Sequence, residues 1–145
     1  MKFKSIDHSV NIITIKKDEK LYGMTCAWAM QCDYDKLLCL LGSQSETLKV
    51  IEKGDIIGVN VLAKDQIDIS LVFGEKHSSE INKFIGVNYK LNKSAVLIEG
   101  SVCQLSCEVI DILHLNELEE DGLLYLRIIN GLECDKQYLH MSDFK

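Results

Sequence analysis

The densest cluster of hydrogen-bonding side chains in the sequence is Ser43, Gln44, Ser45 and Thr47, and a cation, Lys49, follows it. Hydroxyl groups at the start of a helix bind anions, because the free N–H groups of the first turn point outward and the helix dipole adds partial positive charge. Lys49 lies one turn beyond Ser45 and would offset part of a phosphate's charge. The pattern therefore indicates a site for a phosphorylated cofactor.

Helix capping is the competing explanation for these hydroxyls. Ser43 and Glu46 form an S-x-x-E capping box, which satisfies the first N–H groups of a helix without any ligand. The Glu46 carboxylate would also repel a phosphate if it turned inward. Capping accounts for Ser43 and Glu46, but it does not account for Ser45 and Thr47.

A second candidate for chemistry is the run Thr25, Cys26, Ala27 and Trp28. Its small side chains would leave a strand backbone accessible to a flat ring, while Thr25 offers a hydroxyl and Trp28 a large apolar face. The alternative is an ordinary core strand with an interior tryptophan. No cation stands beside Cys26 in the sequence to lower the pKa of its thiol, so we interpret it as a small apolar filler.

The six cysteines and four histidines indicate no further site. No C-x-x-C pair occurs, and the nearest two cysteines, Cys103 and Cys107, suit neither a zinc ribbon nor a zinc finger. The histidines are scattered, with no serine or cysteine partner at a recognisable spacing, which argues against a hydrolase. We predict structural thiols and no metal site.

Short apolar stretches surround both candidates and predict a mainly β protein. The expected strands are Val10–Ile15, Leu21–Met30, Lys36–Leu41, Asp55–Leu62, Ala95–Cys103, Cys107–Leu113 and Leu123–Ile129. Lys36–Leu41 shows no alternation at its apolar end, so we expect it at the centre of the sheet with both faces covered. Many short strands and a few short helices indicate a closed or partly closed antiparallel barrel.

Helices are expected to be few and short. The first is predicted between Gly42 and Gly54, with about two turns. The stretch Asp65–Phe73 fits strand alternation and helical spacing equally, and Gly74 is expected to end it in either case. A further short helix is expected over Ser79–Phe84.

Length and charge restrict the class of protein. The chain has 145 residues, of which 47% are hydrophobic, and a net charge of −6, so we expect one globular domain over residues 1–145. The negative charge argues against nucleic acid and anionic membranes as partners. No apolar run approaches the roughly 20 residues of a membrane span, and the start of the sequence lacks the apolar centre of a signal peptide. We therefore expect a cytoplasmic protein with reduced cysteines.

Six short motifs occur in an order and spacing that carry a resemblance. In chain order they are Val-x-Ile-Ile-Thr at residues 10–14, Gly-Met-Thr-x-Ala-Trp at 23–28, Ser-x-Thr-x-x-x-Ile at 45–51, Ile-x-Val-Asn-Val-Leu at 57–62, Asp-Gln at 65–66 and Lys-Phe at 83–84. Together they resemble the flavin reductase-like, FMN-binding split-barrel family, including its flavoredoxin branch. The resemblance covers most of the chain, roughly Met1 to Phe144.

The resemblance implies an antiparallel Greek-key split β-barrel that binds FMN as a homodimer, with the flavin near the dimer interface. FAD is less favoured, because a short chain covers the smaller FMN more easily. In the implied reaction NADH or NADPH gives a hydride to the flavin, and the electrons leave to a second flavin, a protein or another small molecule. The implied cofactor-binding residues are Thr25, Cys26, Ala27 and Trp28 along the ring, and Ser43, Gln44, Ser45, Thr47 and Lys49 at the phosphate.

One departure from the family pattern keeps a second function open. The reductase pattern Gly-Asp-His-x-x-Phe appears here as Glu-Asp-Gly-Leu-Leu-Tyr at residues 120–125, so Gly122 stands where the family has a histidine associated with nicotinamide. The chain would then be a non-catalytic flavin-binding electron carrier or a redox-responsive module. A third alternative, favoured by Glu46, is a barrel without a cofactor that serves in protein interaction.

Overall fold

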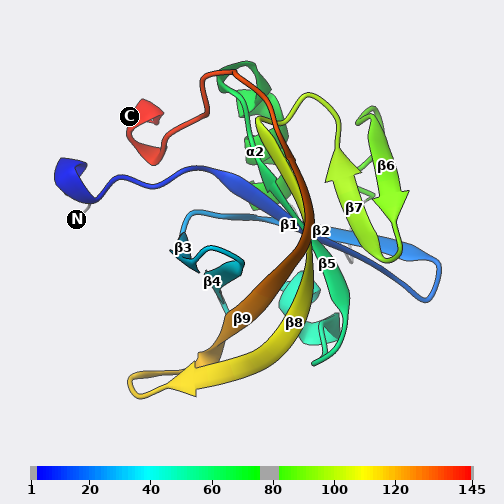
Figure 1. Ribbon diagram of the computed structural model, residues 1–145, viewed down its shortest axis with the longest axis vertical. Helices are drawn as coiled ribbons and strands as arrows, with labels where there is room; N and C mark the ends of the chain where they lie inside the picture. The colour runs from blue at the N-terminus through cyan, green and yellow to red at the C-terminus, as the bar shows by residue number, and fades with distance from the viewer. Residues whose placement is uncertain (1–2, 76–81, 145) are drawn as a thin grey trace.

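A seven-stranded antiparallel sheet dominates the fold (Figure 1). The computed structural model describes residues 3–75 and 82–144. The expectation of a mainly β, antiparallel protein with a few short helices is confirmed. Across the sheet the strands are ordered β2 (Lys20–Cys26), β1 (Asn11–Lys17), β5 (Ile56–Val61), β8 (Cys103–Leu115), β9 (Leu118–Glu133), β4 (Lys36–Leu41) and β3 (Ala29–Asp33).

The remaining elements surround this sheet. Strands β6 (Tyr89–Asn92) and β7 (Ala95–Ile98) form a two-stranded ribbon beside it, and β8 and β9 project together as a long hairpin (Figure 1). Within the described residues the helical elements are α1 (Glu46–Val50), α2 (Ile67–Glu75) and the short 3-10 turns η1 (Lys4–Ile6), η2 (Lys64–Gln66) and η3 (Met141–Asp143).

The two edges of the main sheet are joined by only two residues. Strands β2 and β3 lie at opposite edges, yet only Ala27 and Trp28 separate them in the sequence. A flat sheet of this width would hold its edges about 28 Å apart at a strand spacing of about 4.7 Å, whereas the three peptide steps from Cys26 to Ala29 reach about 11 Å. The sheet therefore has to curl. The Leu40 N–H donates to the Trp28 carbonyl (2.8 Å) and ties the crossing segment to β4.

Alternate strand residues form two apolar clusters on the two faces of the curled sheet. The first joins inward-facing residues of β1, β4, β5, β8 and β9, and α1 packs against it through Leu48. The second joins the other face of β1 to α2 and β7, through Ile12, Phe73 and Val96. The curled sheet is therefore packed on both faces around β1, and α1 is held by apolar contacts with the first cluster.

Two buried polar side chains fasten the β6–β7 ribbon to the main sheet. Thr14 donates from Oγ1 to the Val96 carbonyl (2.6 Å) and accepts the Val96 N–H (3.1 Å). Asn60 donates to the carbonyls of Ile12 and Val96 (3.2 and 3.1 Å) and accepts the Ile98 N–H (2.8 Å). Both side chains are fully buried, so these bonds replace the water that the backbone groups have lost.

Three strand predictions need correction. The stretch Ala95–Cys103, expected as one strand, is divided, because β7 ends at Ile98 and β8 begins only at Cys103. Strand β4 has the predicted bounds, but it lies next to the edge strand β3, and only its alternate residues Leu37, Cys39 and Leu41 are buried. The prediction of a central strand is wrong, because the apolar residues of its other face are partly exposed. The run Leu21–Met30, expected as one strand, is divided where the chain changes edge of the sheet.

The helical predictions are resolved as follows. The ambiguous stretch Asp65–Phe73 is helical, and α2 continues through Gly74, which therefore does not end it. The helix expected over Ser79–Phe84 falls largely outside the described residues. In the described part of the chain, no helix has the length and apolar character needed to cross a membrane.

Replacing Asn60 with alanine is expected to lower the free energy of unfolding by about 3 kcal/mol, because a buried N–H and two carbonyls lose their partner. Urea unfolding followed by circular dichroism measures this change. Asn130, which is exposed on β9, provides the matched Asn130→Ala control. Equal stability of the two variants would contradict the fastening role of Asn60.

Candidate functional site

The two segments that the sequence singles out lie side by side. The Ser45 Oγ is 2.9 Å from the Met24 Sδ, so the loop before α1 touches β2 immediately ahead of the Thr25–Trp28 run. Met24 is partly buried against the first apolar cluster. Sequence reasoning did not select Met24, whose one signal is its place in the Gly-Met-Thr motif. A ligand that spans both segments requires this adjacency.

Ser45, and not Ser43, caps α1. The Ser45 Oγ accepts the Leu48 N–H at 3.2 Å. The predicted capping box is wrong, because a turn precedes the helix and delays its start until Glu46. The predicted end is wrong too: Gly54 adopts a left-handed φ of +90°, but the helix ends four residues earlier.

Charges of both signs lie at the loop before α1. The Ser43 N–H donates to Oδ1 of Asp121 at 3.0 Å, and Lys49 pairs with Glu46 at 3.1 Å. The Gln44 side chain is exposed. Because two carboxylates stand beside one ammonium group, this loop is less positive than a bare helix N-terminus. Asp121 was noticed in the sequence only as part of a family pattern.

Two of the predicted hydroxyls are turned into the protein. The Thr25 Oγ1 donates to the Ser70 carbonyl in α2 at 2.7 Å, which fixes its direction away from the loop before α1. Thr47 is only 1% exposed. In the loop before α1 and in the helix, the accessible polar side chains of the predicted set are therefore Ser43, Gln44, Ser45 and Lys49.

Cys26 is a packing residue. It is 3% exposed, and its sulfur lies 3.6 Å from the carbonyl oxygens of Trp28 and Leu40. Burial raises the pKa of its thiol to about 12. A thiol that stays protonated in this way is a poor nucleophile, in agreement with the interpretation of Cys26 as a filler.

Trp28 is not an interior core residue. Its side chain is 51% exposed, and its ring meets the His8 imidazole edge to face, with centroids 4.9 Å apart. Ala27, beside it, is half-buried. The crossing segment therefore presents a partly open aromatic wall, and His8, which no sequence pattern indicated, lies against that wall.

Position 122, where the reductase pattern has histidine, lies under α1. A Cβ atom at Gly122 would be 2.6 Å from Cδ1 of Leu48. Any side chain at this position would require Leu48 to move. The Leu48 side chain thus occupies the space into which a side chain at position 122 would extend.

Two hollows among the described residues lie elsewhere. One, of about 330 Å³, lies between the β1–β2 hairpin and β6, and the other is an open depression at the β3–β4 turn. Neither is lined by residues 24–28 or 42–49. Within residues 3–75 and 82–144, no three His, Cys, Asp or Glu side chains gather as a metal site would require.

The chain belongs to the flavin reductase like domain family, whose pattern matches residues 3–141. This match confirms the resemblance noted in the sequence and supports an assignment to the flavin-dependent oxidoreductases. A flavin site is therefore expected among the strands and α1 described above.

Two curated relatives share part of this chain. It is 29% identical over 96 residues to the high molecular weight rubredoxin of Moorella thermoacetica, an alignment that covers 63% of this chain and 42% of that protein. It is 28% identical over 106 residues to the reductase subunit HsaB of a flavin-dependent monooxygenase from Mycobacterium tuberculosis, covering 71% and 55%. The chain thus spans about half the length of these relatives.

A solved structure confirms the fold. The NADH:FAD oxidoreductase SgcE6 of Streptomyces globisporus C-1027 superposes with a TM-score of 0.83 over 93% of this chain and 81% of that chain. Sequence identity in this superposition is 16%. The likeness therefore concerns the fold.

Thiol reactivity tests the burial of the cysteines. At about pH 8 a thiol reagent is expected to modify Cys32 and Cys134 rapidly, because both are exposed. Burial raises the pKa of the other four thiols above the ordinary value, so the buried Cys26, Cys39 and Cys107 should react only on unfolding and the half-buried Cys103 slowly. Peptide mass spectrometry after timed labelling identifies the modified residues. Rapid labelling of Cys26 in the folded protein would contradict its placement.

Proposed function

We propose that this chain is an FMN-binding oxidoreductase that passes electrons from a reduced nicotinamide, through the flavin, to a small-molecule or protein acceptor. The observation that carries the proposal is the contact of Ser45 with Met24, because it puts the loop before α1 beside the crossing segment Cys26–Trp28. A phosphate at the loop and a ring at the crossing segment are then within reach of one ligand. Membership of the family supports flavin as that ligand.

The residues available at these two places fit a flavin with one terminal phosphate. Ser43, Gln44, Ser45 and Lys49 would hold the phosphate, while the backbone of the crossing segment and the Trp28 ring would lie along the isoalloxazine. When bound, a flavin accepts a hydride and releases electrons singly or in pairs. FMN is proposed over FAD because its phosphate ends at the loop and leaves no nucleotide to cover.

The protein's own contribution is to position and shield. Trp28, whose ring is held by His8, supplies an apolar wall that excludes water from one side of a ring placed there. The Thr25 hydroxyl, bonded to the Ser70 carbonyl, and the buried Cys26 side chain fix the backbone of β2 from its two faces. Neither of these two side chains would transfer protons, because both are committed within the protein.

Comparing FMN with riboflavin isolates the phosphate contribution. In a Gln44→Ala/Lys49→Met double variant, the Kd for FMN is expected to rise about tenfold, since a charge-assisted partner and a hydrogen bond are lost, while the Kd for riboflavin stays unchanged. Quenching of flavin fluorescence measures both constants. Lys53→Met removes another exposed, ion-paired cation, which lies beyond α1, and is the control. Equal changes for the two flavins would exclude the phosphate from this loop.

A non-catalytic electron carrier is the second candidate function. The observation that favours it is Gly122 under Leu48, where a histidine, as in the reductase pattern, would require the Leu48 side chain to move. Both functions require bound flavin, so they differ only in how the flavin is reduced.

Anaerobic mixing with NADH or NADPH distinguishes an enzyme from a carrier. An enzyme is expected to bleach its flavin within seconds or faster, the timescale of ordinary turnover. Stopped-flow absorbance measures this rate. A flavin that dithionite reduces but neither nucleotide does would establish the carrier, and a protein that takes up no flavin would contradict both functions.

We further propose a homodimer that uses the outer face of β3, β4, β9 and β8. Cross-strand pairing puts apolar side chains together on this face, and they are left partly exposed, Met30 by 58% and Leu113 by 39%. A patch of this kind is typical of a protein interface. It begins two residues after Trp28, so a second copy would lie close to the crossing segment. Its members are Met30, Leu38, Leu40, Leu113, Leu123 and Tyr125.

A charge placed within this face tests the dimer. Met30→Glu is expected to convert the dimer to a monomer, because the carboxylate would have to be buried at the interface. Light scattering coupled to size-exclusion chromatography gives the mass. Gln31→Glu introduces a carboxylate at the next residue of β3, which points to the other face, and should leave the dimer intact. A monomeric parent protein would rule out this interface.

We also propose a cytoplasmic location. The six cysteines are present as free thiols, two of them exposed. Exposed thiols persist in a reducing compartment, whereas secretion would expose them to oxidation.

A further inference from the structure

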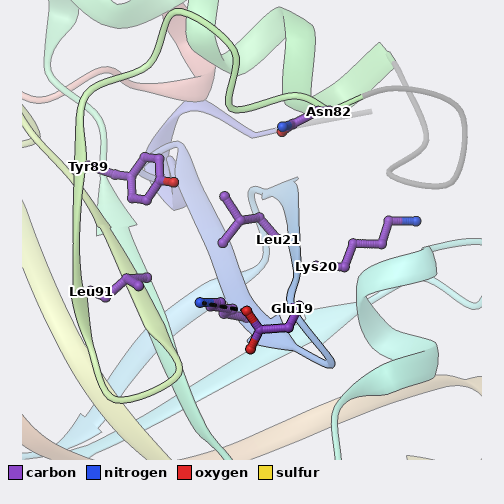
Figure 2. Close-up of a pocket in the computed structure, with 7 residues that line it drawn as sticks. Glu19, Lys20, Leu21, Asn82, Tyr89 and Leu91 are labelled. Carbon is purple, nitrogen blue, oxygen red and sulfur yellow. Dashed lines mark ion pairs between the residues drawn. The ribbon is translucent and has the colours of Figure 1, made fainter.

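A hollow between the β1–β2 hairpin and β6 has the dimensions of a ligand site (Figure 2). Its volume is about 330 Å³. Small-molecule pockets begin at roughly 300 Å³, so this hollow would take one or two fused rings. It is lined by Lys16, Glu19, Lys20, Leu21, Asn82, Tyr89 and Leu91.

Leu21, Tyr89 and Leu91 form the apolar part of the lining of this hollow. Figure 2 shows the Tyr89 phenol directed toward Leu21, with Leu91 on the same side as Tyr89. The Tyr89 ring packs edge to face on Phe84, which is 4% exposed, with centroids 5.7 Å apart. A flat aromatic ring between these side chains would replace water on an apolar surface that is already in place.

The polar groups at the hollow are mainly hydrogen-bond donors. Asn82 accepts the Phe84 N–H through Oδ1 (3.0 Å), which orients its amide, and none of the described residues accepts a hydrogen bond from its Nδ2. The Tyr89 hydroxyl has no partner among the described residues either. Lys16 has a weak partner, because its ammonium is 3.7 Å from Glu19, whose side chain is 94% exposed.

The second cation of the lining, Lys20, directs its ammonium group away from the hollow. The Lys20 ammonium lies 5.0 Å from the centroid of the Tyr22 ring, and Figure 2 shows it pointing away from Tyr89 and Leu91. Lys20 therefore lines the hollow with its aliphatic stem. Lys16 is the cation that a ligand in the hollow would use.

We propose that this hollow binds a small planar aromatic carboxylate. The ring lies between Tyr89, Leu21 and Leu91, and the carboxylate takes the place of the exposed Glu19 side chain on Lys16. An aromatic amine would meet Lys16 with like charge. Asn82 and the Tyr89 hydroxyl bind a further oxygen where the acid carries one. This proposal does not depend on the flavin site, because none of these residues belongs to it.

Isothermal titration with 2-naphthoate tests the proposal, with 2-naphthylmethylamine as the probe of opposite charge. Saturable binding of one naphthoate per chain is expected, and the amine should bind at least tenfold more weakly. Lys16→Met should raise the Kd for naphthoate about tenfold. Lys53→Met is the matched control, since Lys53 forms an ion pair of the same 3.7 Å length, with Asp111, outside the hollow. That variant should bind as the parent does.

The proposal is overturned by a lack of naphthoate binding, by equal binding of the two probes, or by equal effects of the two lysine substitutions. If Lys16→Met fails to fold, Leu91→Trp decides, because Leu91 is 46% exposed and a larger ring there fills the hollow. Leu91→Trp should abolish naphthoate binding, and retained affinity would place the acid elsewhere. Displacement of naphthoate by saturating FMN would also contradict the proposal, because it would put the acid at the crossing segment.

Discussion

The fold depends on the short connection between the two edges of the main sheet. Only Ala27 and Trp28 lie between β2 and β3, so seven strands have to curl until the end of β2 comes close to the start of β3. The curl encloses the first apolar cluster and brings the end of β2 to β4, where the Leu40 N–H binds the Trp28 carbonyl. It also leaves Trp28 half exposed at the crossing. The feature that defines the scaffold therefore also creates the surface at which we propose that the flavin ring lies.

The candidate site is built by packing on both sides of this crossing segment. On one side Met24 contacts Ser45, and Leu48 holds α1 over Gly122. On the other side the Thr25 hydroxyl is tied to α2. Buried polar bonds from Thr14 and Asn60 add the β6–β7 ribbon, which supplies one wall of the hollow at Tyr89. The places proposed for flavin and for an aromatic acid thus share β2, at opposite ends of the strand.

Sequence patterns predicted the mainly β class, the bounds of Lys36–Leu41 and the two segments that meet at Ser45 and Met24. These features follow from local apolar patterning or from motif spacing. The position of β4 in the sheet was predicted wrongly, because both of its faces carry apolar side chains but only one face is buried. The sequence of such a strand does not differ from that of a strand buried on both faces. The cap of α1 was misplaced by two residues, since serines at 43 and 45 are equally good caps and only the turn geometry chooses between them. The fixing of Thr25 by Ser70 depends on tertiary contact, which no local pattern records.

The carboxylate of Asp121 on the Ser43 N–H has an implication for how the loop before α1 behaves. A loop whose N–H already has an internal acceptor keeps its shape without a ligand. A flavin phosphate bound where we propose it would meet a preorganised surface and would not have to supply the free energy of ordering it. The same carboxylate would lie close to that phosphate and repel it, which would shorten its residence. Rapid exchange, rather than permanent retention, is the behaviour that such a loop favours.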